Sequence, residues 1–130
     1  MTTDLMMLVW SAVLCVVLAL PYTLGMIGHV GLPKMAGNRE GVEIPEGWMG
    51  RAKRAHVNMI ESLAPFAALV LVAHVIGAAS PNSALGAQLF FWGRVAHAVL
   101  YIAGVPWART AAWAVSIVGM VLVLLAILSK

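Results

Sequence analysis

The stretch that decides the fold is Ser62–Gly93, SLAPFAALVLVAHVIGAASPNSALGAQLFFWG, which has 32 residues and no Asp, Glu, Lys or Arg. A helix of about 20 apolar residues is enough to cross a bilayer, so this stretch is too long for one span. Its middle, Gly77–Ser83, combines small residues, a proline and turn formers. This run predicts a tight connection between two antiparallel membrane helices.

Outside this stretch, the chain has three further windows without a charged side chain: Leu5–Pro33, Val95–Ala108 and Thr110–Ser129. Together the windows predict four helices, at about 5–31, 48–77, 81–103 and 106–128. Pro81 and Pro106 suit the first turn of their helices. The expected fold is an all-α integral membrane four-helix bundle, with residues 1–130 in one domain.

The composition agrees with a membrane protein. Of the 130 residues, 62% are hydrophobic and 10% are charged, and the mean hydropathy is +0.95. So few charged residues cannot cover the surface of a soluble domain, which argues against a soluble enzyme and against a nucleic-acid binder. A single cysteine, Cys15, excludes an internal disulfide and a zinc site built from cysteines, and we expect no metal.

The basic residues predict the orientation in the membrane. An even number of spans places both termini on one side. The connections on the other side collect nearly all the positive charge: Lys34, Arg39, Arg51, Lys53, Arg54 and Arg109. Lys130 is the one basic residue on the terminal side. By the positive-inside rule the basic side is cytoplasmic, and both termini are non-cytoplasmic. The amino terminus lacks the positive region of a signal peptide, so the first helix is expected to remain as a span.

Two stripes of polar residues lie on the second and third predicted helices. Spacing of i, i+4 and i+7 places three side chains on one face of helix 48–77: Arg54, Asn58 and Glu61. Spacing of i, i+3 and i+7 does the same on helix 81–103: Arg94, His97 and Tyr101. The two helices are antiparallel neighbours, so the stripes are expected to line one cavity. A charge within a span costs at least about 2.5–3.5 kcal/mol, so these residues should avoid lipid.

Two interpretations of the stripes are open. In the first, Glu61 and Arg94 form an ion pair that holds the helices together, and Asn58 and His97 add interhelical hydrogen bonds. In the second, the stripes bind a polar ligand, because they offer more polar groups than one structural pair needs. Such a ligand is anionic and also carries an ammonium or amide group that Glu61 can accept from.

Three segments resemble signatures of the superfamily of membrane-associated proteins in eicosanoid and glutathione metabolism (MAPEG). Arg54–Phe66, RAHVNMIESLAPF, resembles its second-helix signature, and Gly93–Tyr101, GRVAHAVLY, resembles its third. Pro106–Thr110, PWART, resembles the start of its fourth helix. The likeness extends over nearly the whole chain. The chain looks most like a bacterial-type member that resembles microsomal glutathione transferases and prostaglandin E synthases.

The resemblance implies a homotrimer that binds glutathione between adjacent subunits near the cytoplasmic face. It places six residues in or around the glutathione pocket: Arg54, Asn58, Glu61, Arg94, His97 and Tyr101. It places Arg109 at the glutathione sulfur, with Thr110 where some members carry serine. Lys34 and Asn38 resemble a remnant of the basic first-loop segment that reaches the carboxylates of the peptide. Val57 and Trp113 stand where the prostaglandin synthase branch has an arginine and a tyrosine, and the link from Tyr101 to Arg109 in this chain is one residue shorter than in that branch.

The implied function is that of a glutathione-dependent transferase or peroxidase in a membrane, expected to be the bacterial inner membrane. Its second substrate is a lipophilic electrophile or hydroperoxide that arrives through the membrane lipid. Glutathione serves as co-substrate. Two alternatives from other classes are a non-catalytic scaffold or regulatory subunit of the same family and a small proton-coupled exporter, which would use a buried carboxylate.

Overall fold

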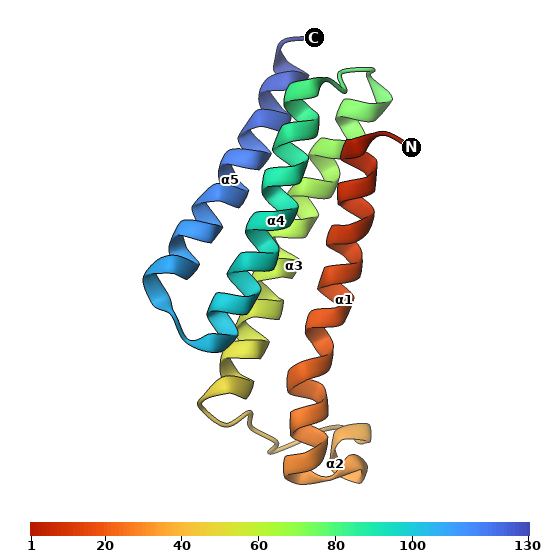
Figure 1. The fold of residues 1–130 in the computed structure, drawn as a ribbon. Helices are drawn as coiled ribbons and strands as arrows, with labels where there is room; N and C mark the ends of the chain where they lie inside the picture. The colour runs from red at the N-terminus through yellow and green to blue at the C-terminus, as the bar shows by residue number, and fades with distance from the viewer.

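The structure, a computed structural model, describes residues 1–130 and contains helices but no strand (Figure 1). The elements are α1 (Thr3–Val30), α2 (Leu32–Ala36), α3 (Trp48–Val75), α4 (Pro81–Ala103) and α5 (Pro106–Leu128). The bounds of the four long helices agree with the sequence expectation to within two residues. The short helix α2 was not predicted.

Local signals explain where the helices begin and end. The side chain of Thr2 accepts a hydrogen bond from the amide of Leu5 at 3.4 Å and caps α1. Before α4, Ser80 and Ser83 form a reciprocal capping box, with hydrogen bonds of 2.8 and 3.2 Å. Gly104 ends α4 with a φ of 81°, a left-handed conformation that glycine adopts without strain. These signals make the α3–α4 and α4–α5 connections short.

Small residues bring α4 and α5 into the most extensive contact between any two helices. A Cβ atom on Gly86 would lie 2.5 Å from the carbonyl oxygen of Gly119. One on Gly93 would lie 3.0 Å from the amide nitrogen of Ser116. The two backbones therefore approach as closely as they do only because these positions lack side chains. This contact fixes the start of α5 beside the end of α4.

The helices that carry the polar stripes, α3 and α4, each contact all the other long helices. Phe66 of α3 stacks on Phe90 of α4 with ring centroids 3.8 Å apart, and both side chains are fully buried. On its other side, α3 is joined to α1 by a 2.8 Å hydrogen bond between the hydroxyl of Tyr22 and Nδ1 of His56. His56 thus faces away from α4, as its spacing from Arg54 predicts.

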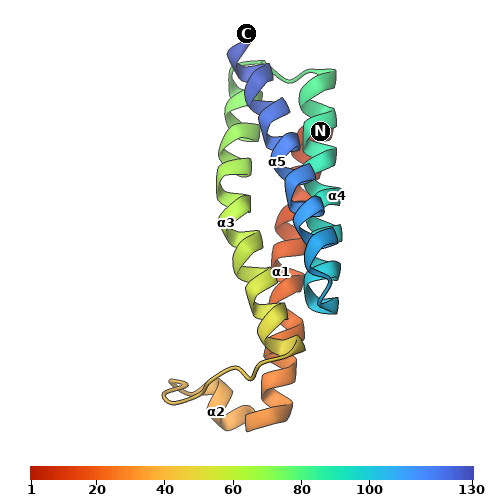
Figure 2. The same ribbon diagram turned by 90° about the vertical axis from the view of Figure 1, so that its left-hand side faces the viewer.

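Three helices, α1, α3 and α5, are long and apolar enough to cross a membrane. Many large apolar side chains on their surfaces are exposed, including Val16, Leu24 and Leu125. These features fit an integral membrane protein. The fourth expected span, α4, is not among the three, because Gln88, Arg94 and His97 interrupt its apolar residues. Figures 1 and 2 show α2 and the α1–α3 connection at the end of the molecule opposite the carboxyl terminus.

Candidate functional site

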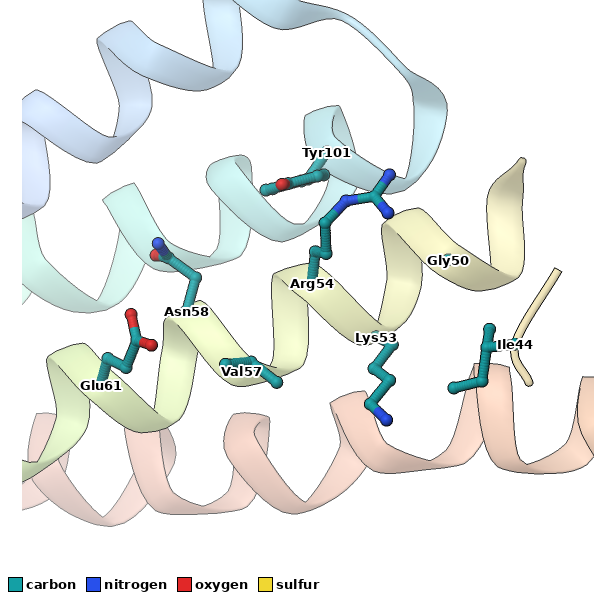
Figure 3. A pocket seen from close by; sticks show the side chains of 8 residues that line it. All are labelled: Ile44, Gly50, Lys53, Arg54, Val57, Asn58, Glu61 and Tyr101. Carbon is teal, nitrogen blue, oxygen red and sulfur yellow. The ribbon is translucent and has the colours of Figure 1, made fainter. Parts of the chain in front are cut away.

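The stripe on α3 faces α4. Figure 3 shows Arg54 and Asn58 extending toward the side of α3 on which Tyr101 lies. Lys53, one residue before Arg54, points instead toward α1, because successive side chains on a helix are about 100° apart. Arg54 and Glu61 are exposed and Asn58 is half-buried.

The stripe on α4 contains the most deeply buried charge of the chain. Arg94 is 1% exposed, and its Nη2 donates a 2.6 Å hydrogen bond to Oδ1 of Asn58. Its Nε and Nη1 are buried without a hydrogen-bond partner, as is Nδ1 of the adjacent His97. Arg94 is therefore bonded to the amide of the facing stripe. The Glu61–Arg94 ion pair, the structural alternative, is not formed.

Tyr101 joins the two stripes to α5. The guanidinium carbon of Arg109 lies 4.3 Å from the centroid of the Tyr101 ring, and that of Arg54 lies 6.0 Å from it. The ring also meets the imidazole of His97 edge to face, with centroids 5.4 Å apart. Both cations are within the range of attraction to an aromatic face. Tyr101 thereby positions one arginine from each neighbouring helix.

Two cavities lie beside these residues, and both are lined by Asn58 and Tyr101. The first has a volume of about 390 Å³, and its lining includes Arg54, Asn58, Glu61 and Tyr101 (Figure 3). The second has a volume of about 310 Å³ and is lined by Asn58, His97, Tyr101, Arg109, Thr110 and Trp113. Seven of the ten predicted site residues line one or both cavities, and the eighth, Arg94, is bonded to Asn58 behind them.

The remaining two predicted residues, Lys34 and Asn38, are not part of this arrangement within one chain. They are exposed and line a separate cavity of about 270 Å³ beside α2. Thr110 borders the second cavity, but its hydroxyl donates to the carbonyl oxygen of Pro106 at 3.1 Å. In this conformation its proton is engaged with the backbone, so donation to a ligand requires a change of rotamer.

Some lining residues were not recognised from the sequence as part of a site. Ile44 belongs to the α2–α3 connection, and Lys53 precedes the stripe on the helix; both border the first cavity. The placement of Ile44 depends on tertiary packing and has no sequence signal. Arg51, which the sequence placed only among the basic residues of the cytoplasmic side, donates from Nε to the carbonyl oxygen of Ile102 at 3.0 Å. It therefore caps the carboxyl end of α4, where a cation is favourable.

The chemistry of the lining suits an anionic peptide with one ammonium group. Three cations, Lys53, Arg54 and Arg109, border the two cavities, and Glu61 is the single carboxylate. The unpartnered nitrogen atoms of Arg94 and His97 lie next to the shared wall. No group of three or more His, Cys, Asp or Glu side chains is placed to hold a metal ion.

The structure thus defines an all-helical protein with membrane-spanning helices and a charged site between α3, α4 and α5. The chain belongs to the MAPEG family, whose family model matches residues 5–129. No curated protein and no solved structure matches it. Membership places it among membrane proteins of glutathione and eicosanoid metabolism, a family that includes glutathione transferases and non-catalytic members.

Proposed function

We propose that the protein is a glutathione-dependent transferase or peroxidase that acts on lipophilic electrophiles or hydroperoxides. The observation that carries this proposal is the pair of cavities that meet at Asn58 and Tyr101, with Glu61 in one and Arg109 in the other. A ligand that spans both cavities contacts separate groups for its charges and for its reactive atom.

Glutathione has the matching groups. A carboxylate of glutathione suits the guanidinium of Arg54, and its ammonium suits the carboxylate of Glu61. The amide of Asn58 and the hydroxyl of Tyr101 can bond to its peptide groups. This arrangement leaves the thiol for the second cavity, where Arg109 is the cation.

Arg109 is the proposed catalytic residue. A thiol such as that of cysteine has a pKa near 8.5, so only a few per cent is thiolate at neutral pH. A guanidinium beside the sulfur favours the thiolate, and lowering the thiol pKa by two units corresponds to about 2.7 kcal/mol. In transfer, the thiolate forms a carbon–sulfur bond to the electrophile and the leaving group departs. In peroxide reduction, two glutathiones become a disulfide while the hydroperoxide becomes an alcohol and water.

The exposed charges on α3 support assembly into a homotrimer. Glu61 is exposed in one chain and lies in a helix that fits a membrane span, where contact with lipid would cost about 2.5–3.5 kcal/mol or more. Adjacent subunits that cover this face would also bring the α2 segment of one chain, with Lys34 and Asn38, toward the site of another. α4 is proposed as the fourth span, because its Arg94 and His97 are buried in protein.

This topology puts both termini on the non-cytoplasmic side, with the basic connections in the cytoplasm of a bacterial inner membrane. Glutathione then reaches the site from water and the second substrate reaches it from the bilayer. One cavity borders the interfacial connection through Ile44, and the other includes the apolar Trp113.

A non-catalytic scaffold of the same family is the main alternative, and the presence of Arg109 at the second cavity favours the enzyme over it. A proton-coupled exporter is the other. An exporter would need a buried carboxylate, and Asp4 in α1 is one: it is 3% exposed, and its Oδ2 has no hydrogen-bond partner. Asp4 lies in the first turn of α1, at the end of a span and far from the midplane position that a carrier's acid occupies.

Calorimetric titration of the detergent-purified chain with reduced glutathione tests the proposal. We expect saturable binding that is tighter than for cysteine or other low-molecular-weight thiols. Turnover of a lipophilic aryl halide or hydroperoxide then separates the enzyme from the scaffold. Glutathione binding without turnover supports the scaffold, and proton-driven efflux of a cationic dye supports the exporter.

A further inference from the structure

A further cavity lies between α1, α2 and the start of α3, and it shares Ile44 and Lys53 with the first cavity of the candidate site. It has a volume of about 240 Å³ and is lined by Tyr22, Met26, Met35, Arg39, Val42, Ile44 and Lys53; we call it the α1–α3 cavity. Two of its lining residues are cations and none is a carboxylate. Glu40 and Glu43, the nearest acids in sequence, are exposed and do not line it. Its charge therefore favours an anion.

Both cations of the α1–α3 cavity are exposed, and one of them, Arg39, is held by a hydrogen bond. Nε of Arg39 donates to the carbonyl oxygen of Met35 at 2.6 Å. Arg39 is also the one non-glycine residue with a positive φ, 59°, a left-handed backbone conformation that is uncommon for residues other than glycine. Lys53 extends toward α1 and away from Tyr101 (Figure 3). Arg39 and Lys53 come from different elements, and both border this one cavity.

The rest of the α1–α3 cavity suits an amphiphile. Met26 and Met35 are 1% and 5% exposed, and Val42 and Ile44 extend the apolar wall. The hydroxyl of Tyr22, 2.8 Å from Nδ1 of His56, adds a polar group to the lining. An apolar wall beneath two cations matches a ligand with an anionic head and an apolar body better than it matches a free ion.

The depth of the cavity agrees with this ligand. α1 has 28 residues and a length of roughly 42 Å, whereas the hydrocarbon core is about 30 Å thick. If α1 is centred on that core, it extends about 6 Å beyond it at each end. Met26, four residues before the end of α1 at Val30, then lies at the boundary between the hydrocarbon core and the lipid headgroups, and Tyr22 lies about one turn inside that boundary. The α1–α3 connection, which contributes Arg39 and Val42, lies at the same end of the molecule (Figure 2).

We propose that the α1–α3 cavity binds the phosphate headgroup of an anionic phospholipid of the adjacent leaflet. Arg39 and Lys53 bind the phosphate oxygens, and the Met26–Met35 wall contacts the glycerol and the first acyl methylenes. Ordinary attraction of basic loops to an anionic membrane is diffuse. The proposed site is instead saturable, with one lipid per chain, and it does not depend on glutathione.

Native mass spectrometry of the full chain in an uncharged detergent tests this proposal. Titration with phosphatidylglycerol, in the absence of glutathione, should show one retained lipid per chain, bound about tenfold more tightly than phosphatidylcholine. Arg39→Gln should abolish that preference, and Arg39→Lys should retain most of it. Lys34→Gln is the matched control, because it removes one positive charge from the same segment outside the cavity. If the melting temperature shows that Arg39→Gln does not fold, Lys53→Gln in α3 takes its place and should also abolish the preference for phosphatidylglycerol.

Equal retention of the two lipids would overturn the proposal. So would a loss of preference in Lys34→Gln as large as that in Arg39→Gln, which would indicate diffuse surface charge. A third titration, after those with phosphatidylglycerol and phosphatidylcholine, uses inorganic phosphate in place of lipid. If phosphate alone binds the wild-type chain as tightly as phosphatidylglycerol does, the site takes a soluble anion and the lipid assignment is wrong.

Discussion

Arg94 on α4 donates a hydrogen bond from Nη2 to Oδ1 of Asn58 on α3 at 2.6 Å, and this is the only hydrogen bond that its buried guanidinium makes. The bond connects the two polar stripes at the wall that the two cavities share. Because Nε and Nη1 have no partner of their own, the stability of this charge depends on a single neutral amide.

Replacing Asn58 should therefore destabilise the fold as well as the site. Asn58→Ala leaves the Arg94 guanidinium with no hydrogen-bond partner, and we expect a loss of about 1–3 kcal/mol, measured as a lower melting temperature in detergent. Asn38→Ala, an exposed position on the α2–α3 connection, is the control and should change stability by less than about 0.5 kcal/mol. An unchanged melting temperature for Asn58→Ala would mean that Arg94 finds another partner.

Glu61 should contribute to binding more than to folding. Its side chain is exposed within one chain, and Arg94 is bonded to Asn58 and not to it. If Glu61 accepts from the ammonium of glutathione, Glu61→Gln should weaken binding by about tenfold or more in calorimetry. The same variant should bind deaminated glutathione as well as the wild type does. An equal loss for both ligands would remove Glu61 from the ammonium site.

The ring of Tyr101 should position Arg109. The 4.3 Å separation between the Arg109 guanidinium carbon and the ring centroid corresponds to an attraction of about 0.5–2 kcal/mol. Tyr101→Leu should lower turnover by about twofold to thirtyfold, whereas Tyr101→Phe keeps the ring and should retain more of the rate. Steady-state kinetics with a lipophilic aryl halide measures both. Equal losses in the two variants would show that the hydroxyl matters and the ring does not.

The contact between α4 and α5 should tolerate no added methyl group. A Cβ on Gly86 would lie 2.5 Å from the carbonyl oxygen of Gly119, so Gly86→Ala should destabilise by about 1–3 kcal/mol through overpacking. Gly28→Ala in α1 is the matched control, since a Cβ there meets nothing within 4 Å, and it should be neutral or stabilising by up to about 1 kcal/mol. Thermal unfolding in detergent compares them. Similar melting temperatures would contradict the close approach.

The sequence was sufficient to predict the long helices, because their signals are local. Charge-free windows located them, and Pro81 and Pro106 marked the first turns of α4 and α5. Helical spacing also brought Arg54, Asn58, Arg94 and Tyr101 to facing sides of α3 and α4. The family resemblance was confirmed by the family match over residues 5–129.

The sequence did not predict which side chains on these faces bond to one another. Opposite charges suggested Glu61 as the partner of Arg94, yet a shift of about one helical turn makes Asn58 the partner. The sequence also did not predict α2 or the position of Ile44, because the α1–α3 connection has no periodic pattern and its path depends on tertiary contacts. The role of Arg51 at the end of α4 was missed because it depends on a contact between α3 and α4 that helical spacing does not reveal.

The central claim is that Arg109 stabilises the thiolate of bound glutathione. Arg109 borders the second cavity, apart from Glu61 and Arg54 in the first. Arg109→Ala should therefore leave glutathione affinity within a few-fold, while turnover falls by roughly tenfold to a thousandfold. Arg109→Lys should restore only part of the rate, because a point charge replaces a planar guanidinium.

The most direct measurement is the thiolate absorbance of bound glutathione as a function of pH, in the wild type and in Arg109→Ala. A cation beside the sulfur lowers the thiol pKa, so its removal should shift the ionisation midpoint upward, toward the value near 8.5 of a free thiol. We predict that upward shift together with retained affinity. An Arg109→Ala protein that ionises glutathione at the wild-type pH, or that loses affinity in proportion to rate, would contradict the assignment and make Arg109 a binding residue.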